Sequence, residues 1–124
     1  MKEKITSYKD LEVWRKSIVL VKQVYFLTSS FPNEERFGIT SQMRRAAVSI
    51  PSNIAEGWGR FSTKNYIQFL KNSRGSLFEL ETLLTITIDL EYHDSSQQSV
   101  IAGLMVEIGK MLNAIIVKLE QKEQ

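Results

Sequence analysis

The sequence predicts an all-α protein folded as an antiparallel up-down four-helix bundle. Four long segments place apolar residues three or four positions apart, which is the spacing of one helix face. Short stretches with proline, glycine, asparagine or serine separate them, and short connections favour antiparallel neighbours. No run reads as a strand bounded by turn residues. With 124 residues in all, we expect one four-helix-bundle domain over residues 1–124.

The first helix is expected over about residues 11–30. Asp10 is a candidate N-cap, with Ser7 as the alternative one turn earlier. The helix ends at Phe31 because the residue before a proline avoids the α conformation. Two apolar stripes lie side by side, and this wide arc suits either the middle of a bundle or a subunit contact. The first contains Leu11, Trp14, Ile18, Val21, Tyr25 and Thr28, and the second Val13, Leu20, Val24 and Leu27.

The second helix is expected over about residues 41–59, with Thr40 or Ser41 as N-cap. Pro51 lies inside it, and an interior proline costs about 3 kcal/mol unless the helix bends. Because the apolar spacing continues on both sides, we expect one continuous helix kinked at Pro51; two short helices broken at Ile50 are the alternative. Its apolar face contains Met43, Ala47, Ile50, Ile54 and Trp58, and its polar face Gln42, Arg45, Ser49, Ser52 or Asn53, Glu56 and Arg60.

The third helix is expected over about residues 63–92, opening at Ser62. Several small residues stand close together in the third helix, one of them a glycine. We expect them because the backbone of another helix approaches closely at this point. The fourth helix is expected over about residues 96–120, with Ser95 and Gln98 as a capping box. The third stripe contains Tyr66, Phe69 or Leu70, Ser73, Leu77, Leu80, Leu84 and Thr87; the fourth contains Ile101, Leu104, Ile108, Met111, Ile115 and Leu119. The small residues expected in contact are Ser73, Gly75 and Ser76, facing Ala46 and Ala47.

Composition excludes several classes of protein. The chain has no cysteine, which rules out disulfides, thiolate metal sites and cysteine nucleophiles. Its N-terminal stretch lacks the apolar core of a secretion signal, and the most apolar early run, residues 17–27, is too short to span a bilayer. We therefore expect a cytoplasmic protein that does not enter a membrane.

The charges are unevenly distributed although the net charge is only +2. Residues 1–32 carry a net +3, residues 33–75 carry +4 and residues 76–124 carry −5. This asymmetry suits either a surface that binds polyanions or head-to-tail pairing of subunits. A solvated mixture of surface charges is the plain alternative.

Signatures of an enzyme are missing from the sequence. The single histidine, His93, is expected in a loop at a helix end, where a surface or capping role suits it better than catalysis. There is no Glu-x-x-His pair, HExxH, phosphate loop or GxSxG motif. Glu56 beside Arg45 or Arg60 is most simply a salt bridge. We expect no catalytic residue, no metal site and no cofactor.

Basic side chains are concentrated on the second and third predicted helices. The guanidinium fork matches two phosphate oxygens, so the arginines suit contacts with a nucleic-acid backbone. Binding of this kind is salt-sensitive and weakly specific, since no base-reading motif is present. Arginines that tie helices or subunits together are the alternative. The candidate nucleic-acid-binding residues are Arg44, Arg45, Arg60, Lys64, Lys71 and Arg74.

Self-association is also indicated, because the chain has more large apolar residues than one slim bundle core can hide. A closed homo-oligomer is the commonest outcome of such exposure. Beyond the second stripe of the first helix, the aromatic residues concerned are Trp14, Tyr25, Phe26, Phe31, Trp58, Phe61 and Tyr66.

Three stretches resemble the four-helix-bundle proteins of the ribosomal-RNA intervening-sequence family: YKDLEVWRKS at residues 8–17, the long segment at residues 24–60, and FLKNSRGSLFELETLL at residues 69–84. Members of this family are encoded inside inserts in bacterial large-subunit ribosomal RNA genes or stand alone elsewhere, and most have no established activity. A relative is the accessory variability protein of diversity-generating retroelements. That relative implies a homopentamer with a basic surface that binds RNA or DNA and a reverse transcriptase.

The central motif of the family lies in the second predicted helix. The resemblance assigns it no catalytic role, and we expect Gln42, Ser49, Asn53 and Glu56 at a subunit or ligand contact. The acidic last third of the chain departs from the strongly basic retroelement relative, which weakens the expectation of nucleic-acid binding but not that of a bundle or an oligomer. The motif positions are Gln42, Arg44, Arg45, Ala46, Ala47, Ser49, Ile50, Pro51, Asn53, Ile54, Glu56, Gly57 and Arg60.

Two hypotheses of different class remain. The first is a non-enzymatic homo-oligomeric binding module, pentameric by resemblance, that contacts RNA or DNA, or a nucleic-acid-handling protein such as a reverse transcriptase. The second is a purely structural interaction scaffold that binds no nucleic acid and whose arginines tie subunits together.

Overall fold

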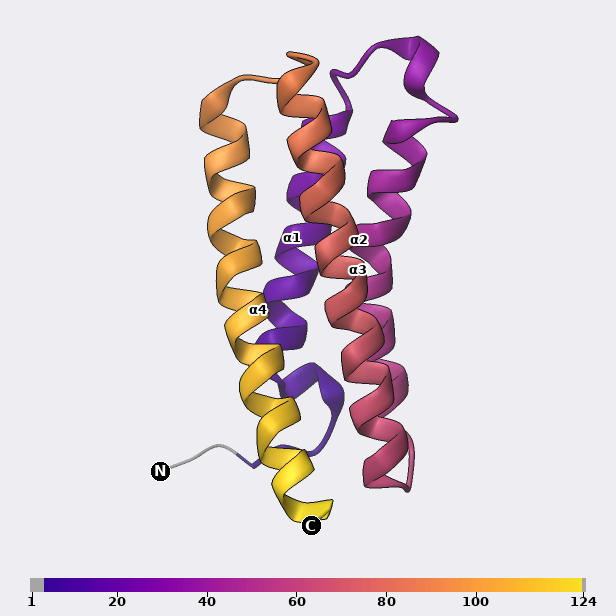
Figure 1. Ribbon diagram of the computed structural model, residues 1–124, viewed down its shortest axis with the longest axis vertical. Helices are drawn as coiled ribbons and strands as arrows, with labels where there is room; N and C mark the ends of the chain where they lie inside the picture. Colours follow the sequence, from indigo (N-terminus) through magenta and orange to yellow (C-terminus); the bar gives the residue numbers. More distant parts are fainter. Residues whose placement is uncertain (1–3, 124) are drawn as a thin grey trace.

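The computed structural model describes residues 4–123, and these form four long α-helices (Figure 1). The helices lie side by side along one long axis, and their short connections lie at the ends of the bundle (Figure 1). The predicted all-α four-helix fold is confirmed, while positions 1–3 and 124 of the predicted single domain lie outside the described residues. The elements are η1 (Tyr8–Asp10), α1 (Glu12–Thr28), η2 (Asn33–Glu35), α2 (Ile39–Trp58), α3 (Thr63–Asp89) and α4 (Ser95–Glu123), where η marks a short 3₁₀ helix.

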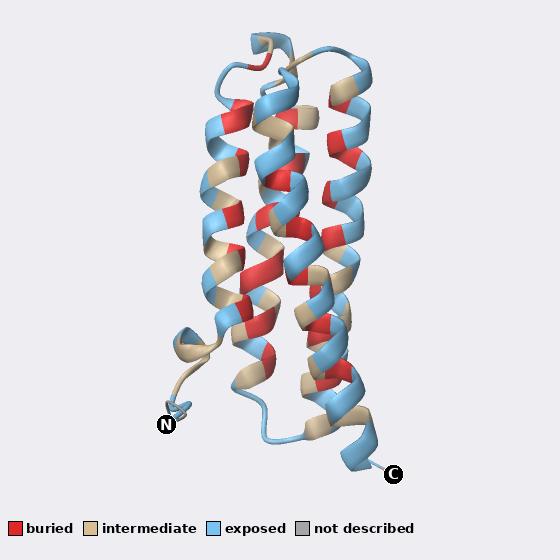
Figure 2. Ribbon diagram, turned by 90° about the vertical axis from the view of Figure 1, so that its left-hand side faces the viewer, coloured by how far each residue is buried: buried red, intermediate tan, exposed pale blue. Residues whose placement is uncertain are grey.

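One apolar core runs the length of the bundle, where buried positions of all four helices face inward (Figure 2). The predicted face of α2 is confirmed, since Met43, Ala47, Ile50 and Ile54 are fully buried and Trp58 is partly buried. In α1 and α4, the predicted stripes are divided between the core and its flanks. The core positions of α1 and α4 are Val13, Leu20, Val24, Leu27, Ile101, Met105, Ile108, Leu112 and Ile116, while Trp14, Val21, Leu104, Met111 and Ile115 are partly buried at the flanks.

Helix α2 continues without interruption through Pro51, which is buried. The alternative of two short helices broken at Ile50 is therefore wrong, and the kink at Pro51 stays a prediction. The Ser73 hydroxyl of α3 donates a hydrogen bond of 2.9 Å to the carbonyl oxygen of Ile50, one residue before the proline. This bond joins α3 to α2 at the residue before the proline.

The close approach of α2 and α3 differs from the predicted one. A Cβ atom added at Gly57 would lie 2.7 Å from Cβ of Phe69 and 3.0 Å from Cδ1 of Tyr66. At Gly75, where close contact was predicted, a Cβ atom would meet nothing within 4 Å. Gly75 faces outward because it lies two residues after the buried Ser73 on the same helix. The glycine required by packing is therefore Gly57.

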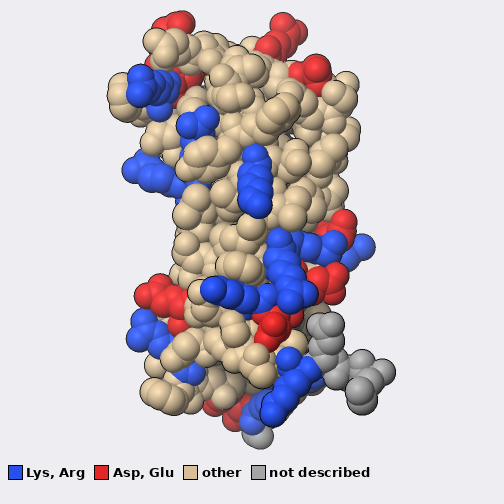
Figure 3. Space-filling view, turned by 180° about the vertical axis from the view of Figure 1, so that it is seen from behind, with Lys and Arg blue, Asp and Glu red and all other residues tan. Residues whose placement is uncertain are grey.

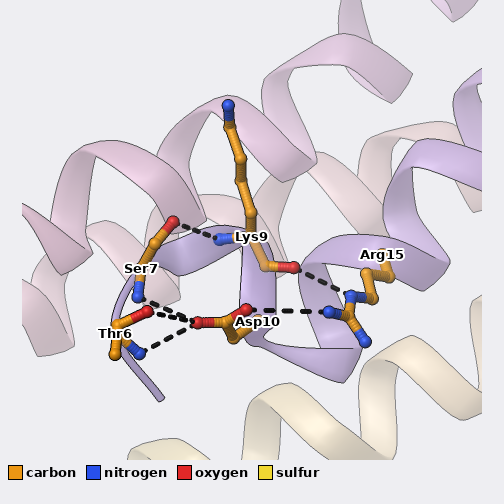
Figure 4. A network of polar contacts seen from close by, with 5 residues as sticks. All are labelled: Thr6, Ser7, Lys9, Asp10 and Arg15. Carbon is orange, nitrogen blue, oxygen red and sulfur yellow. Dashed lines mark hydrogen bonds and ion pairs between the residues drawn. The ribbon is translucent and has the colours of Figure 1, made fainter. Parts of the chain in front are cut away.

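The N-terminal segment before α1 is held by hydrogen bonds to Asp10 (Figure 4). The Asp10 carboxylate accepts from the backbone and hydroxyl of Thr6 and from the backbone of Ser7, and Arg15 lies 3.7 Å from it. These hydrogen bonds, led by the one from the Thr6 backbone, lower the pKa of Asp10. Ser7 caps η1 through the Lys9 amide. Neither predicted cap serves α1 itself, whose N-cap is Leu11 without a side-chain bond, because the 3₁₀ turn intervenes.

The other predicted helix starts are partly confirmed. Ser62 caps α3 by accepting from the Asn65 amide. Helix α4 is capped by Asp94 rather than Ser95, since the Asp94 carboxylate accepts from the amides of Ser96 and Gln97. Helix α2 begins earlier than predicted, at Ile39, and its N-cap Gly38 provides no side-chain bond. Thr40 and Ser41 are therefore already inside the first turn.

Helix α4 is unusually apolar for its exposure. Over its most apolar 18-residue window the mean hydropathy is 1.9, yet only 28% of that window is buried. By length and composition this helix could cross a membrane, although core helices of soluble proteins meet the same description. The expectation that the protein does not enter a membrane stays a prediction.

Candidate functional site

The arginines of α2 stand at the end of the bundle where α1 turns into α2. Arg44 is held in a defined orientation: its Nε donates a 2.9 Å hydrogen bond to Oγ1 of Thr28, and its guanidinium carbon lies 4.6 Å from the ring centroid of Tyr25. Thr28 is in turn fixed because its hydroxyl donates to the Val24 carbonyl at 2.8 Å. The two terminal nitrogens of Arg44 have no acceptor or carboxylate partner among residues 4–123.

A groove of about 530 Å³ lies beside Arg44, between α1, the η2 connection and the first half of α2. This volume falls in the range of roughly 300–1,000 Å³ that is typical of ligand sites. None of the residues that line the groove is acidic. We call it the arginine groove, and its polar lining residues are Arg36, Thr40, Ser41, Arg44, Arg45 and Ser49.

The acids nearest to the groove in sequence belong to η2. Glu35 does not line the groove, and its Oε2 accepts a 2.9 Å hydrogen bond from the Tyr92 hydroxyl of the α3–α4 connection. This bond raises the pKa of Tyr92, because losing the phenolic proton would place two negative charges side by side. Glu35 therefore ties the two connections at this end of the bundle together.

The other four predicted basic residues lie elsewhere. Arg60 follows the end of α2, about 20 Å from Arg45 by helical rise; it is 3.5 Å from Glu56 and its guanidinium stacks on Phe69. On the α3–α4 side, Nζ of Lys71 is 3.2 Å from a carboxylate oxygen of Glu120. Nη1 of Arg74 donates to Oδ1 of Asn113 at 2.9 Å, and Lys64 lines a groove that also contains Glu120 and Glu123. The six predicted residues therefore do not form one surface.

The space-filling view agrees with this division (Figure 3). Positive side chains stand on the upper left of the face shown, with negative side chains at the upper end of the same face, whereas in the lower half positive and negative side chains alternate (Figure 3). A phosphate backbone is repelled by carboxylates as strongly as it is attracted by the neighbouring cations. The arginine groove therefore joins three arginines with no acid among its lining residues, although the Glu35 carboxylate lies close by, with Oε1 2.8 Å from the position of a Cβ atom added at Gly38.

The family-motif residues have varied surroundings. Ser49 and Asn53 belong to a polar contact between α2 and α3: the Ser49 hydroxyl accepts 2.9 Å bonds from the Asn53 amide and from the Ser76 hydroxyl. Gln42 and Glu56 are exposed. Ser49 and Asn53 thus tie helices of the same chain together, and the predicted role of all four at a subunit or ligand contact stays a prediction.

Sequence reasoning missed several residues of the groove. Arg36 and Phe37 were not singled out, yet Phe37 is 89% exposed and carries the Arg36 guanidinium 5.3 Å from its ring centroid. Thr40 was interpreted as a helix cap. The available signal was an aromatic residue next to an arginine on a short loop that precedes an arginine-bearing helix.

The described residues contain nothing that resembles a reaction centre. Within residues 4–123, no group of three or more histidine, aspartate or glutamate side chains is placed to hold a metal ion. His93 stacks on Phe31 and its Nε2 lies 3.0 Å from the Thr87 hydroxyl, so it closes the α3–α4 connection as a structural residue. Nothing in this arrangement suggests catalysis.

Comparison with known proteins gives a consistent result. The family model of the 23S rRNA-intervening sequence protein matches residues 9–114. The fold is similar to the crystal structure of a protein with unknown function from the S23 ribosomal protein family from Bacteroides thetaiotaomicron VPI-5482. The two chains are 30% identical, the match covers 84% of this chain and 94% of the other, and the TM-score is 0.77. No curated protein matches this chain.

The family match covers most of the bundle. The matched residues 9–114 include all of α1, α2 and α3 and most of α4, and they contain every position of the arginine groove. The match therefore rests on the whole bundle and not on one local motif. This chain belongs to the 23S rRNA-intervening sequence protein family.

Proposed function

We propose that this chain is a non-enzymatic, self-associating helical-bundle module that binds the phosphate backbone of RNA or DNA through the arginine groove. The observation that carries the proposal is the composition of that groove: three arginines and no acid line it. Arginine is the residue best suited to phosphate because its planar fork can donate to two oxygens at once.

The orientation of Arg44 supports binding over a purely structural role. Its Nε and ring contacts hold the side chain in place, so little side-chain freedom remains to be lost when an anion arrives. The scaffold hypothesis requires basic side chains that link subunits. Lys71 and Arg74 do form links, but they join two helices of the same chain. Arg45, in contrast, is exposed and has no ionic partner among residues 4–123.

Self-association is supported by exposed apolar side chains on α1 and α4. Phe26 is 68% exposed and, with the half-exposed Val100, lines a groove between these two helices. Val106 and Val117 lie further along α4, and each is more than half exposed. Large exposed apolar side chains of this kind are candidates for contact sites. The family resemblance suggests five copies.

Nucleic-acid binding is tested by fluorescence anisotropy with labelled RNA and DNA oligonucleotides over a salt series. We expect the logarithm of the affinity to fall linearly with the logarithm of the salt concentration. Arg44→Gln and Arg45→Gln should each weaken binding at every sequence and reduce the salt slope by about one. Lys118→Gln removes the same charge from an exposed position on α4 and should have little effect.

Assembly is tested separately by native mass spectrometry of the same variants. Val106→Glu should reduce the number of copies in the assembly, because it buries a charge at the proposed contact. A monomeric wild-type protein at micromolar concentration would contradict self-association. If Arg44→Gln and Arg45→Gln change the assembly while the wild type binds no nucleic acid at low salt, the scaffold hypothesis is correct instead.

A further inference from the structure

We infer that Ser49 is an uncharged hydrogen-bond donor of the arginine groove, which binds a phosphate oxygen beside Arg45, and that Asn53 and Ser76 position its hydroxyl. This inference rests on the proposed function and names a contact in the middle of α2, away from the start of that helix. Three observations carry it: the hydrogen bonds that Ser49 makes, its register with Arg45, and its distance from the nearest acid.

The Asn53 side chain is oriented by its own contacts. Its amide nitrogen, Nδ2, lies 2.8 Å from the backbone carbonyl oxygen of Ser49. Because a carbonyl oxygen can only accept, this contact places the NH₂ group of Asn53, and not its amide oxygen, next to Ser49. The same NH₂ group donates its other N–H to Oγ of Ser49 at 2.9 Å. One lone pair of the Ser49 hydroxyl is therefore occupied by Asn53.

The Ser76 hydroxyl of α3 occupies the other lone pair. It donates to Oγ of Ser49 at 2.9 Å across the contact between the two helices. A serine hydroxyl has two acceptor positions and one proton, so Ser49 can make a further hydrogen bond only as a donor. Its proton has no acceptor among residues 4–123. Because Ser49 is only partly buried and lines the arginine groove, a ligand in the groove can supply that acceptor.

The Thr40 hydroxyl, which also belongs to the groove lining, cannot play this part. Thr40 is only 6% exposed, and among the described residues its Oγ1 is the one buried side-chain oxygen or nitrogen without a hydrogen-bond partner. That oxygen is enclosed by protein, so a ligand atom does not reach it. The accessible donor is therefore Ser49.

Ser49 stands next to Arg45 along the groove. Side chains four residues apart on a helix lie on the same face, one above the other. Arg45 is exposed and has no ionic partner among residues 4–123. A guanidinium fork and a hydroxyl on successive turns can donate to different oxygens of one phosphate group. Arg45 supplies the charge of this contact, and Ser49 supplies a neutral donor.

The contact lies well away from the acid of the preceding connection. Oε1 of Glu35 is 2.8 Å from the position of a Cβ atom added at Gly38, at the start of α2. Ser49 follows Gly38 by eleven residues, a helical rise of about 16 Å, which exceeds the screening length of about 8 Å at physiological salt. Glu35 therefore opposes a phosphate at the first turn of α2 much more than one beside Ser49.

The test measures anisotropy with a labelled twelve-nucleotide uridine RNA over a salt series. Ser49→Ala should weaken binding by roughly tenfold at every salt concentration, because one hydrogen bond to a charged group is lost. The salt slope should stay that of the wild type, since no charge is removed, whereas Arg45→Gln reduces the slope by about one. Ser49→Thr keeps the hydroxyl and should bind within about twofold of the wild type.

The positioning role is tested by a double-mutant cycle. Ser76→Ala frees a lone pair of Ser49, so the hydroxyl is no longer restricted to donating, and RNA binding should weaken by about threefold. In the Ser49→Ala background the same change should have no further effect, because the positioned group is already absent. Thermal unfolding of each variant, followed by circular dichroism, checks that the helices are folded at the temperature of the binding experiment.

A matched control separates the groove from the rest of α2. Ser52→Ala removes an exposed hydroxyl that donates to the Val48 carbonyl and does not line the groove, and it should bind RNA like the wild type. If Ser49→Ala binds like the wild type, or lowers the salt slope as Arg45→Gln does, the inference is wrong while the proposed function stands. A further loss from Ser76→Ala in the Ser49→Ala background overturns the positioning role. A wild type that binds no RNA at low salt overturns both the inference and the proposed function.

Discussion

Two glycines of this protein should respond to alanine with opposite signs. Gly57 lies in the last turn of α2 against α3, and Gly75 lies inside α3 with open space around it. Neither has a positive φ, so alanine is compatible with both backbones. The comparison isolates the effect of tight packing from that of helix propensity.

The expected magnitudes follow from these surroundings. At Gly75, alanine gains its full helix propensity, about 1 kcal/mol, and meets no atom within 4 Å. At Gly57 the gain is about half as large because the position is near the helix end, and overpacking costs about 1–3 kcal/mol. The nearest atoms are Cβ of Phe69 at 2.7 Å and Cδ1 of Tyr66 at 3.0 Å. A Cβ atom moves only with its backbone, so α3 must shift as a unit, and Gly57→Ala should destabilise by about 0.5–2.5 kcal/mol.

Urea denaturation followed by circular dichroism provides the measurement. With a slope of about 1–3 kcal/mol per molar urea, the midpoints of the two variants should lie on opposite sides of the wild type. Each series is repeated at tenfold lower protein concentration, because assembly makes the apparent stability concentration-dependent. If Gly57→Ala stabilises the protein as much as Gly75→Ala, the close packing of α2 on α3 is wrong.

Two further predictions concern polar groups. Ser73→Ala should lower the free energy of unfolding by about 1 kcal/mol, because the buried hydroxyl donates to the Ile50 carbonyl, whereas the exposed Ser52→Ala should have a smaller effect in the same urea experiment. Hydrogen bonds from the Ser96 hydroxyl and the Gln97 amide lower the pKa of Asp94 below its ordinary 3.8, so its contribution to stability is complete above that pH and is lost as the pH falls through the lowered value. Asp94→Asn should therefore lose less stability than the wild type in thermal unfolding between pH 5 and pH 2, and equal losses would contradict the cap.

The helices and their order could be predicted because they depend on local spacing. The apolar face of α2 was predicted correctly at Met43, Ile50 and Ile54, since each helix turn repeats the same register. Helix starts were predicted less well: Ser62 caps α3 as expected, but α2 begins without a side-chain cap and α4 is capped by Asp94 instead of Ser95. Several capping residues stand near each start, and only the path of the preceding connection selects one of them.

The candidate site could be predicted only in part. Arg44 and Arg45 were identified from their charge, and the structure places both on the arginine groove. Lys71 and Arg74 had the same sequence signal but lie beside Glu120 and Asn113 of α4. Those partners are 39 or more residues away in sequence, so no local pattern could reveal that these two cations are already engaged.

The sequence by itself determined that this chain forms four amphipathic helices and belongs to its family, because apolar period and motif are properties of neighbouring residues. Only the tertiary structure decided which glycine is packed, which cations are paired and which hydroxyl is left without a partner. Each of these depends on atoms that the chain brings together from distant positions, such as Gly57 against Phe69 or Arg44 against Thr28. Which way the polar face of a helix points is decided by the helices that pack against it.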